Sequence, residues 1–196
     1  GSAITLRHLL HHTSGLRDYL SVWPVAGLPD ANVFRREDVY ATIARQQALN
    51  FAPGTNYIYS NTGYWLLGEV VQRVSGQTLR AFAHEHIFAP LGMASSHFHD
   101  DFTEIEPNRA LGHAVRGDGR LRLDLSLCDL MGDSGIYTTV EDLPRWDAIF
   151  YASPLTGGNA LIAQMQEPGR LVDGRAIGYA RGLVVGAYRG ARTVSH

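Results

Sequence analysis

The chain has 196 residues, with 17 basic and 19 acidic side chains and a formal net charge of −2 at pH 7. This balance excludes the strongly basic surface that is typical of nucleic-acid-binding proteins. All 17 basic residues are Arg, so residues 1–196 contain no Schiff-base lysine, phosphate-loop lysine or serine–lysine pair. A single cysteine, Cys128, excludes an intrachain disulfide.

Apolar residues recur at helical spacing in five segments. The predicted helices cover residues 6–12, 36–47, 61–75, 79–88 and 143–150. Between the first two, residues 19–32 carry two prolines and a glycine, which predict a loop. The helix over 61–75 has the clearest pattern, because five Leu and Val residues share one stripe and Gly76 supplies a stop signal.

Two pairs of apolar extended segments flank short turns and predict antiparallel hairpins. They cover residues 111–115 with 121–125, and residues 179–188 with 191–196. Helices and hairpins without a βαβ alternation predict an α+β fold. The longest uncharged stretch, residues 46–68, is interrupted by Pro53 and Gly54, so it does not predict a membrane-spanning helix.

The segment Tyr59-Ser60-Asn61 leads from an extended stretch into the predicted helix over 61–75. Residues two apart in an extended chain point the same way, so the Tyr59 phenol and the Asn61 amide share one face. The unpaired N–H groups of a helix start favour negative charge, and a tyrosine there can transfer protons if cations stabilise its phenolate. On the pattern alone, a half-buried tyrosine beside an asparagine N-cap is the simpler interpretation.

Several segments in this order resemble the penicillin-recognising serine hydrolases, a bacterial group that includes class C β-lactamases, D-alanyl-D-alanine peptidases and related esterases. The matching segments are residues 9–16 (LLHHTSGL), 51–55 (FAPGT), 57–64 (YIYSNTGY), 87–93 (IFAPLGM) and 135–146. The resemblance spans nearly the whole chain. It implies a β-lactamase/transpeptidase-like α+β fold and an acyl-enzyme mechanism without a cofactor.

In that family a Ser-x-x-Lys motif supplies the nucleophile and its lysine, and a Tyr-x-Asn motif supplies a proton-transfer tyrosine and a substrate-binding asparagine. A third motif on a strand, Lys-Thr-Gly or His-x-Gly, lines the opposite wall. The resemblance therefore implies that Tyr59 is catalytic and that Asn61 and His196 bind substrate. The glycine of the third motif would follow residue 196. A neutral imidazole anchors a carboxylate less well than an ammonium group, so an esterase or D-amino-acid peptidase is at least as well supported as a β-lactamase.

The resemblance also implies that residues 1–196 are a partial domain, truncated at both ends, that holds mainly the helical region and part of the antiparallel sheet. Gly1-Ser2 looks like an expression scar. The Ser-x-x-Lys motif is expected before residue 9, so this chain alone is expected to be inactive on an ester, β-lactam or D-amino-acid amide. Unpaired sheet edges are expected to favour self-association. The sequence leaves the compartment open.

Two other functions compete with this interpretation. Gly132-Asp133-Ser134-Gly135 spells the nucleophile motif of chymotrypsin-type proteases, but that fold is a pair of β-barrels, and a glycine-rich turn explains the motif more simply. A non-catalytic, cleft-bearing binding module of the same fold stays open until a Ser-x-x-Lys motif is found upstream.

The nine histidines raise the question of a metal site. His8 and His12 have helical i,i+4 spacing, but no glutamate follows His8 as the His-Glu-x-x-His motif requires. The pairs His84 with His86 and His97 with His99 are two residues apart, and such positions face apart on a helix. We therefore expect no metal site and no cofactor.

Overall fold

The computed structural model of the chain describes residues 3–28, 33–125 and 127–196. Gly1 and Ser2, the expected expression scar, lie outside the described residues. The helices are α1 (Leu6–Leu10), α2 (Tyr19–Val25), α3 (Arg36–Ala44), α4 (Asn61–Ser75), α5 (Leu79–Ala83), the π-helix η1 (His84–Phe88), α6 (Leu143–Ala148) and α7 (Gly158–Met165).

Strands pair two by two and antiparallel within the described part of the chain. The pairs are β1 (His97–Phe98) with β4 (Ile136–Tyr137), β2 (His113–Val115) with β3 (Leu121–Leu123), and β5 (Val184–Tyr188) with β6 (Ala191–Ser195). Helices combined with antiparallel strands confirm the predicted α+β class. Over the same residues, no helix is long and apolar enough to cross a membrane.

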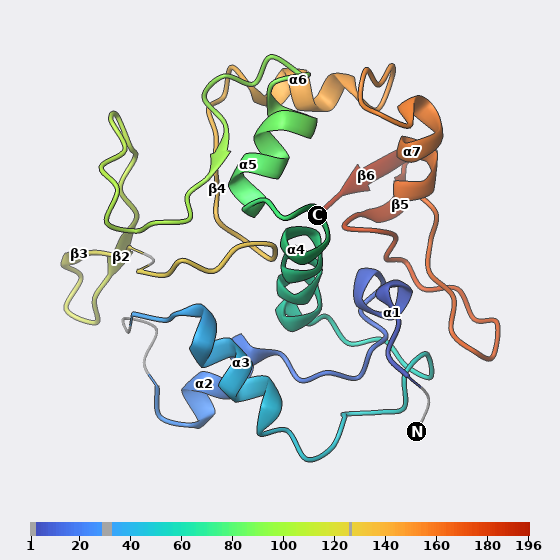
Figure 1. Cartoon of the computed structure of the whole chain (residues 1–196), viewed down its shortest axis with the longest axis horizontal. Helices are drawn as coiled ribbons and strands as arrows, with labels where there is room; N and C mark the ends of the chain where they lie inside the picture. The colour runs from blue at the N-terminus through green and yellow to red at the C-terminus, as the bar shows by residue number, and fades with distance from the viewer. Residues whose placement is uncertain (1–2, 29–32, 126) are drawn as a thin grey trace.

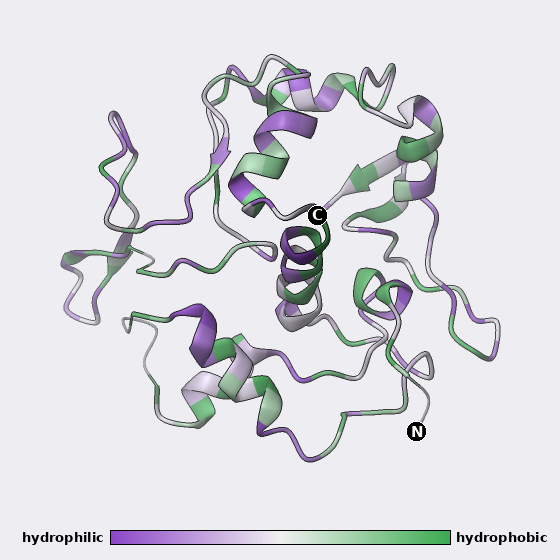
Figure 2. Ribbon diagram, in the orientation of Figure 1, coloured by the Kyte–Doolittle hydropathy of each residue, from purple (hydrophilic) through white to green (hydrophobic). Residues whose placement is uncertain are grey.

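Helix α4 lies at the centre of the molecule, with α1, α2 and α5 packed against it (Figure 1). Its hydrophobic residues gather along one side and its hydrophilic residues along another (Figure 2). Gly63 and Gly68 let neighbouring backbone approach closely, since an added Cβ would lie 3.2 Å from the Leu9 carbonyl oxygen or 3.0 Å from that of Met131. The helix ends where Gly76 adopts a left-handed φ of 73°, as its stop signal predicted.

Aromatic side chains fill the core on the α2–α3 side of α4. Tyr19, Trp23, Val39, Trp65 and Leu130 form one buried cluster. Burial of each such side chain stabilises the fold by about 1.5–3 kcal/mol. A second buried cluster, Ala83, Phe88 and Met93, packs against the partly buried Trp146, so the three tryptophans serve the core.

The prediction of a loop over residues 19–32 is wrong for its first part, because Tyr19–Val25 forms α2. Asp18 caps this helix by accepting a hydrogen bond from the Ser21 N–H at 3.0 Å. Pro24 lies in the last turn, where its missing N–H costs one hydrogen bond. Tyr19 and Trp23, one turn apart, bury their rings in the core, and this tertiary packing outweighs the local proline signal.

The hairpin predicted over 179–196 is confirmed but shorter. Arg189 and Gly190 have φ angles of 50° and 82°, which match a turn whose two central residues are both left-handed. Gly182, with φ of 80°, bends the chain before Val184, so β5 begins five residues later than predicted.

Candidate active site

The backbone N–H groups on both sides of Tyr59 donate hydrogen bonds to His12. The Ile58 N–H donates to the His12 carbonyl oxygen at 3.1 Å, and the Ser60 N–H donates to His12 Nδ1 at 3.1 Å. The His12 ring also lies against the Tyr59 ring, with centroids 4.2 Å apart. His12 therefore determines both the path of the chain and the position of the phenol.

His12 is buried, and this burial lowers its pKa to about 4. The ring is consequently neutral at pH 7. Since Nδ1 accepts a hydrogen bond from an N–H group, the proton of the neutral ring lies on Nε2. This atom is buried and has no hydrogen-bond partner among the residues that the structure describes.

Asp18 connects the N-terminus of α2 to that of α4. Its Oδ1 accepts from the Asn61 backbone N–H at 2.8 Å and from the Asn61 Nδ2 at 2.9 Å, while its Oδ2 accepts from Ser21. The hydrogen bond from Asn61 Nδ2 to Asp18 thus fixes the orientation of the Asn61 amide group. Within the described ranges its Oδ1 takes part in no hydrogen bond, so this oxygen is available as an acceptor.

His196 follows β6 and reaches Tyr59 across 137 positions of the sequence, with Tyr59 Oη 3.3 Å from His196 Nε2. The other ring nitrogen, Nδ1, lies 3.0 Å from the Gly182 carbonyl oxygen and 3.4 Å from Tyr179 Oη. A carbonyl oxygen only accepts hydrogen bonds, so Nδ1 carries the proton of the neutral ring and Nε2 accepts from the Tyr59 hydroxyl.

The Tyr59 phenol is 42% exposed, which makes it accessible to a ligand. Its pKa is raised, first by partial burial and then by the carboxylates of Asp133 and Asp18. Burial also raises the pKa of Asp133 to about 6, and the Tyr19 hydroxyl donates a hydrogen bond to this carboxylate. The phenol is thus protonated at neutral pH in the environment that these residues provide.

The structure therefore brings His196 to Tyr59, while Asn61 lies two residues further along the chain, at the start of α4. Sequence reasoning missed His12 and Asp18, which hold Tyr59 and Asn61. The only sequence signal for His12 is its position inside the family segment 9–16.

The alternative nucleophile, Ser134, lies exposed on a loop between two glycines with positive φ, Gly132 and Gly135. Within the described part of the chain, it makes no side-chain hydrogen bond to a histidine, and the strands form pairs rather than barrels. The chymotrypsin-type alternative is therefore wrong, and the motif is a glycine-rich turn.

His8 and His12 do not lie on one helix, because α1 ends at Leu10. His8 Nδ1 accepts from the Thr5 N–H at 3.2 Å as part of the α1 cap, whereas His12 Nδ1 accepts from Ser60. Each Nδ1 therefore supports the local backbone, and the i,i+4 spacing predicted for a helix does not hold.

Comparison with known proteins identifies the fold. A family model described as Beta-lactamase matches residues 1–196. A D-aminopeptidase from Cereibacter sphaeroides is 29% identical over 203 residues, covering 100% of this chain and 38% of the relative. The octameric penicillin-binding protein homologue from Pyrococcus abyssi superposes with a TM-score of 0.81 at 25% identity, covering 100% of this chain and 46% of that one.

A penicillin-binding protein from Bacillus halodurans superposes with a TM-score of 0.77 at 28% identity, covering 96% of this chain and 58% of that one. The chain thus spans 38% of the curated relative and about half of each solved structure. The predicted β-lactamase/transpeptidase-like fold is confirmed. The chain belongs to the Beta-lactamase family, a family of penicillin-recognising serine hydrolases.

Proposed function

We propose that this chain is the proton-transfer and substrate-binding part of a serine hydrolase that acts through an acyl-enzyme on an ester, β-lactam or D-amino-acid amide. The observation that carries the proposal is the 3.3 Å contact between Tyr59 Oη and His196 Nε2. It joins two segments whose motifs, in this family, line opposite walls of one cleft.

In acylation, a serine oxygen attacks the substrate carbonyl carbon, and the bond from that carbon to the leaving nitrogen or oxygen breaks. The serine proton passes to the leaving group, and water later hydrolyses the ester. Tyr59 relays this proton, which requires a phenolate stabilised by a nearby cation. Because the chain has no lysine, we assign that cation and the nucleophile to a Ser-x-x-Lys motif outside residues 1–196. This chain alone is therefore inactive.

Asn61 and His196 bind the substrate on either side of Tyr59. The Asn61 Oδ1 accepts a hydrogen bond from the substrate's acyl-side N–H, because Asp18 already accepts from the Asn61 nitrogen. His196 positions a substrate carboxylate or, when protonated on Nε2, donates to the Tyr59 phenolate.

Among the three substrate classes, a D-amino-acid amide has the best support. The D-aminopeptidase relative matches over the whole of this chain. His196, in place of a lysine ammonium, provides a weaker anchor for the carboxylate of a β-lactam.

Replacement of the proposed relay tests this function. In the longer protein that contains this chain, Tyr59→Phe is expected to lower kcat for a D-amino-acid p-nitroanilide by about 100-fold or more, since it removes the ionisable proton of a general acid–base group. The matched control is Tyr151→Phe, because Tyr151 is 80% exposed, and its kcat should stay at the wild-type value. A Tyr59→Phe protein that keeps wild-type kcat would exclude Tyr59 from the mechanism.

A further inference from the structure

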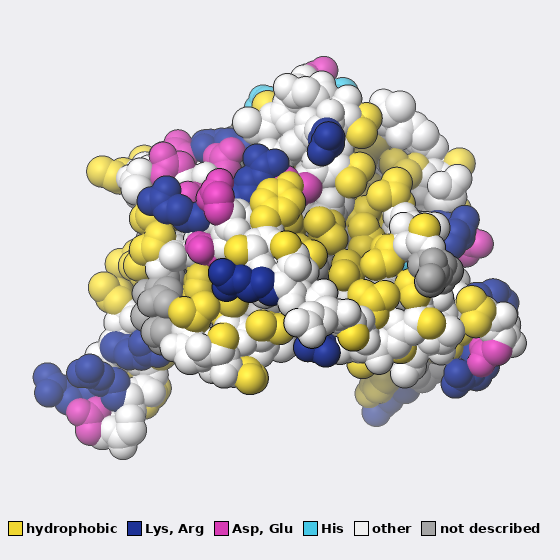
Figure 3. All heavy atoms as spheres, turned by 60° about the horizontal axis from the view of Figure 1, so that its bottom comes forward, with side chains coloured by type: hydrophobic (Ala, Val, Ile, Leu, Met, Phe, Trp, Pro, Cys, Tyr) yellow, Lys and Arg dark blue, Asp and Glu magenta, His cyan; other side chains and the backbone are white. Residues whose placement is uncertain are grey.

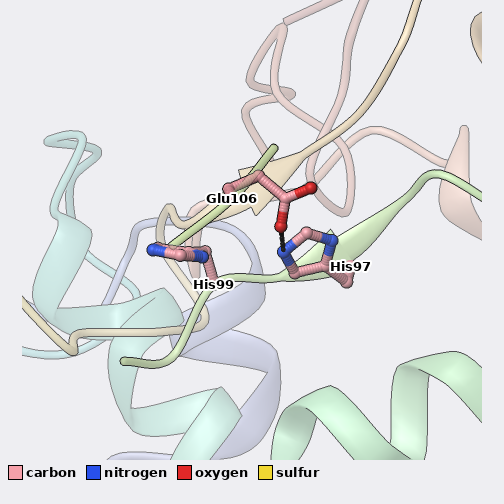
Figure 4. Close-up of side chains that lie close together, drawn as sticks. All are labelled: His97, His99 and Glu106. Atoms are coloured by element: carbon pink, nitrogen blue, oxygen red, sulfur yellow. Dashed lines mark ion pairs between the residues drawn. The ribbon is translucent and has the colours of Figure 1, made fainter. Parts of the chain in front are cut away.

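Three side chains outside the Tyr59 site converge on one point. His97 lies in β1, His99 follows this strand, and Glu106 lies on the segment that leads to β2. The possible ligand atoms of all three lie within 4.8 Å of one another, and His97 Nε2 is 3.4 Å from Glu106 Oε2. Figure 4 shows the Glu106 carboxylate next to the His97 ring, joined to it by a dashed line, with the His99 ring to the left of both in this view.

Three buried nitrogens of these rings make no hydrogen bond within the part of the chain that the structure describes. His99 is only 4% exposed, yet neither of its ring nitrogens has a hydrogen-bond partner within the described ranges, and the same is true of His97 Nε2. Buried polar atoms in folded proteins almost always have a partner. Each neutral imidazole offers one lone pair, because its other ring nitrogen carries the proton. One lone pair from each of these two rings, beside the Glu106 carboxylate, therefore indicates a ligand that accepts lone pairs.

The backbone explains why the two histidines converge. His97 pairs with Tyr137 across the β1–β4 sheet, and the His99 N–H donates to the Gly135 carbonyl oxygen at 2.8 Å, which continues the pairing beyond Phe98. Residues two apart in extended chain point to the same side. The sequence-based argument that this pair faces apart assumed a helix, and that assumption is wrong.

The rings are also oriented before any ligand arrives. The Tyr137 ring stacks on His99, with centroids 4.3 Å apart and planes 9° apart, and lies 5.8 Å from His97. Glu106 is the adjustable member, since its side chain is 31% exposed. A cavity lined by His97, Glu106 and Arg109 adjoins the cluster and provides a path from solvent.

We propose that His97, His99 and Glu106 bind one divalent transition-metal ion, with Zn²⁺ the best match. Two imidazole nitrogens and one carboxylate oxygen are the donors that Zn²⁺ prefers, and three protein ligands leave a fourth position for water. The ion ties the segment after β1 to the β1–β4 pair. This site does not depend on the proposed hydrolase function.

Metal titration of the intact protein as encoded, with the metal alone as the probe, tests the site. After treatment with a chelator, calorimetric titration with Zn²⁺ is expected to give about one ion per chain, and Co²⁺ is expected to give visible absorption bands of a low-symmetry site. Zn²⁺ is also expected to raise the Tm. The absence of stoichiometric binding would overturn the proposal.

Variants assign the ligands. His99→Ala and Glu106→Gln are each expected to weaken Zn²⁺ binding by about 100-fold or more, because even outer-shell changes cost 10–100-fold. Glu106→Gln keeps the side-chain shape and lies on a partly exposed segment, so it separates loss of a ligand from loss of folding, which far-UV circular dichroism checks. The control is His113→Ala, an exposed histidine of β2. Wild-type affinity in both ligand variants would show that Zn²⁺ binds elsewhere.

Discussion

His12 shows how one residue serves both the fold and the site. Its carbonyl oxygen and Nδ1 accept the N–H groups on either side of Tyr59, and its ring fills space against Tyr59, Tyr64 and Tyr179. Loss of the Nδ1 acceptor leaves the buried Ser60 N–H without a partner.

His12→Phe is expected to lower the free energy of unfolding by about 1–3 kcal/mol at pH 7.5, because the ring volume stays while a buried donor loses its acceptor. Urea denaturation measures this difference. The control His86→Phe, at an exposed position, is expected to change stability by less than about 0.5 kcal/mol.

The same pair of proteins reports the titration of His12. Burial lowers its pKa to about 4, so below its ordinary value of about 6.5 the unfolded chain binds more protons than the folded chain. The neutral ring's contribution is therefore present above about pH 6.5 and is lost as the pH falls toward 4. The stability gap between wild type and His12→Phe should narrow over this window. If the difference in unfolding free energy between the two proteins does not change with pH, the buried His12 imidazole is not neutral as assigned.

The sequence nominates three residues of the candidate site, because Tyr59, Asn61 and His196 stand in motifs that resemble a family pattern, and their roles stay a prediction. The residues that hold them, His12 and Asp18, could not be predicted from the sequence. His12 meets Ser60 across 48 positions and Asp18 meets Asn61 across 43, and such contacts arise only once α1, α2 and α4 have packed. The same holds for His97 and Glu106, which no local pattern joins.

At the scale of elements, α4 depends on glycine where α1 and the segment after Leu130 cross it. Alanine normally favours a helix interior over glycine by about 1 kcal/mol. At Gly68, however, an added Cβ would lie 3.0 Å from the Met131 carbonyl oxygen and 3.2 Å from the Gly132 Cα. The packing contact therefore opposes the helix propensity at this position.

Gly68→Ala is expected to lower the free energy of unfolding by about 1–3 kcal/mol, because backbone atoms must move to admit the methyl group. The control Gly117→Ala places its Cβ in open space and should leave stability nearly unchanged. Both are measured by urea denaturation. A stabilised Gly68→Ala protein would mean that the crossing is looser than the structure has it.

Element types followed from the sequence where local signals agreed with packing. The apolar face of α4, its end at Gly76 and the Arg189-Gly190 turn could be predicted from the sequence, because each depends on residues close together in the chain. Helix α2 was missed because Pro24 is a local signal against a helix, whereas the burial of Tyr19 and Trp23 is a tertiary one. The extended geometry at His97 was missed for the same reason, since β4 lies about 40 residues further along the chain.

At the scale of the whole molecule, many large hydrophobic side chains are exposed to solvent. Figure 3 shows hydrophobic side chains spread over a broad, hollowed part of the face it presents. Exposed large hydrophobic residues include Leu6, Tyr40, Ile58, Val184 and Tyr188. Large apolar patches on a protein surface mark contacts with proteins, membranes or ligands, or surface that is prone to aggregate. Self-association of this chain stays a prediction.

Reaction with a fluorophosphonate serine probe, followed by intact-mass analysis, tests whether the nucleophilic serine lies outside residues 1–196. No adduct is expected on the 196-residue chain, and one adduct, at the serine of a Ser-x-x-Lys motif, is expected on the longer protein proposed to contain it. Absence of an adduct on the longer protein would instead favour a non-catalytic, cleft-bearing binding module. Stoichiometric labelling of a serine within residues 1–196, such as Ser134, would contradict the claim that the nucleophile lies outside this chain.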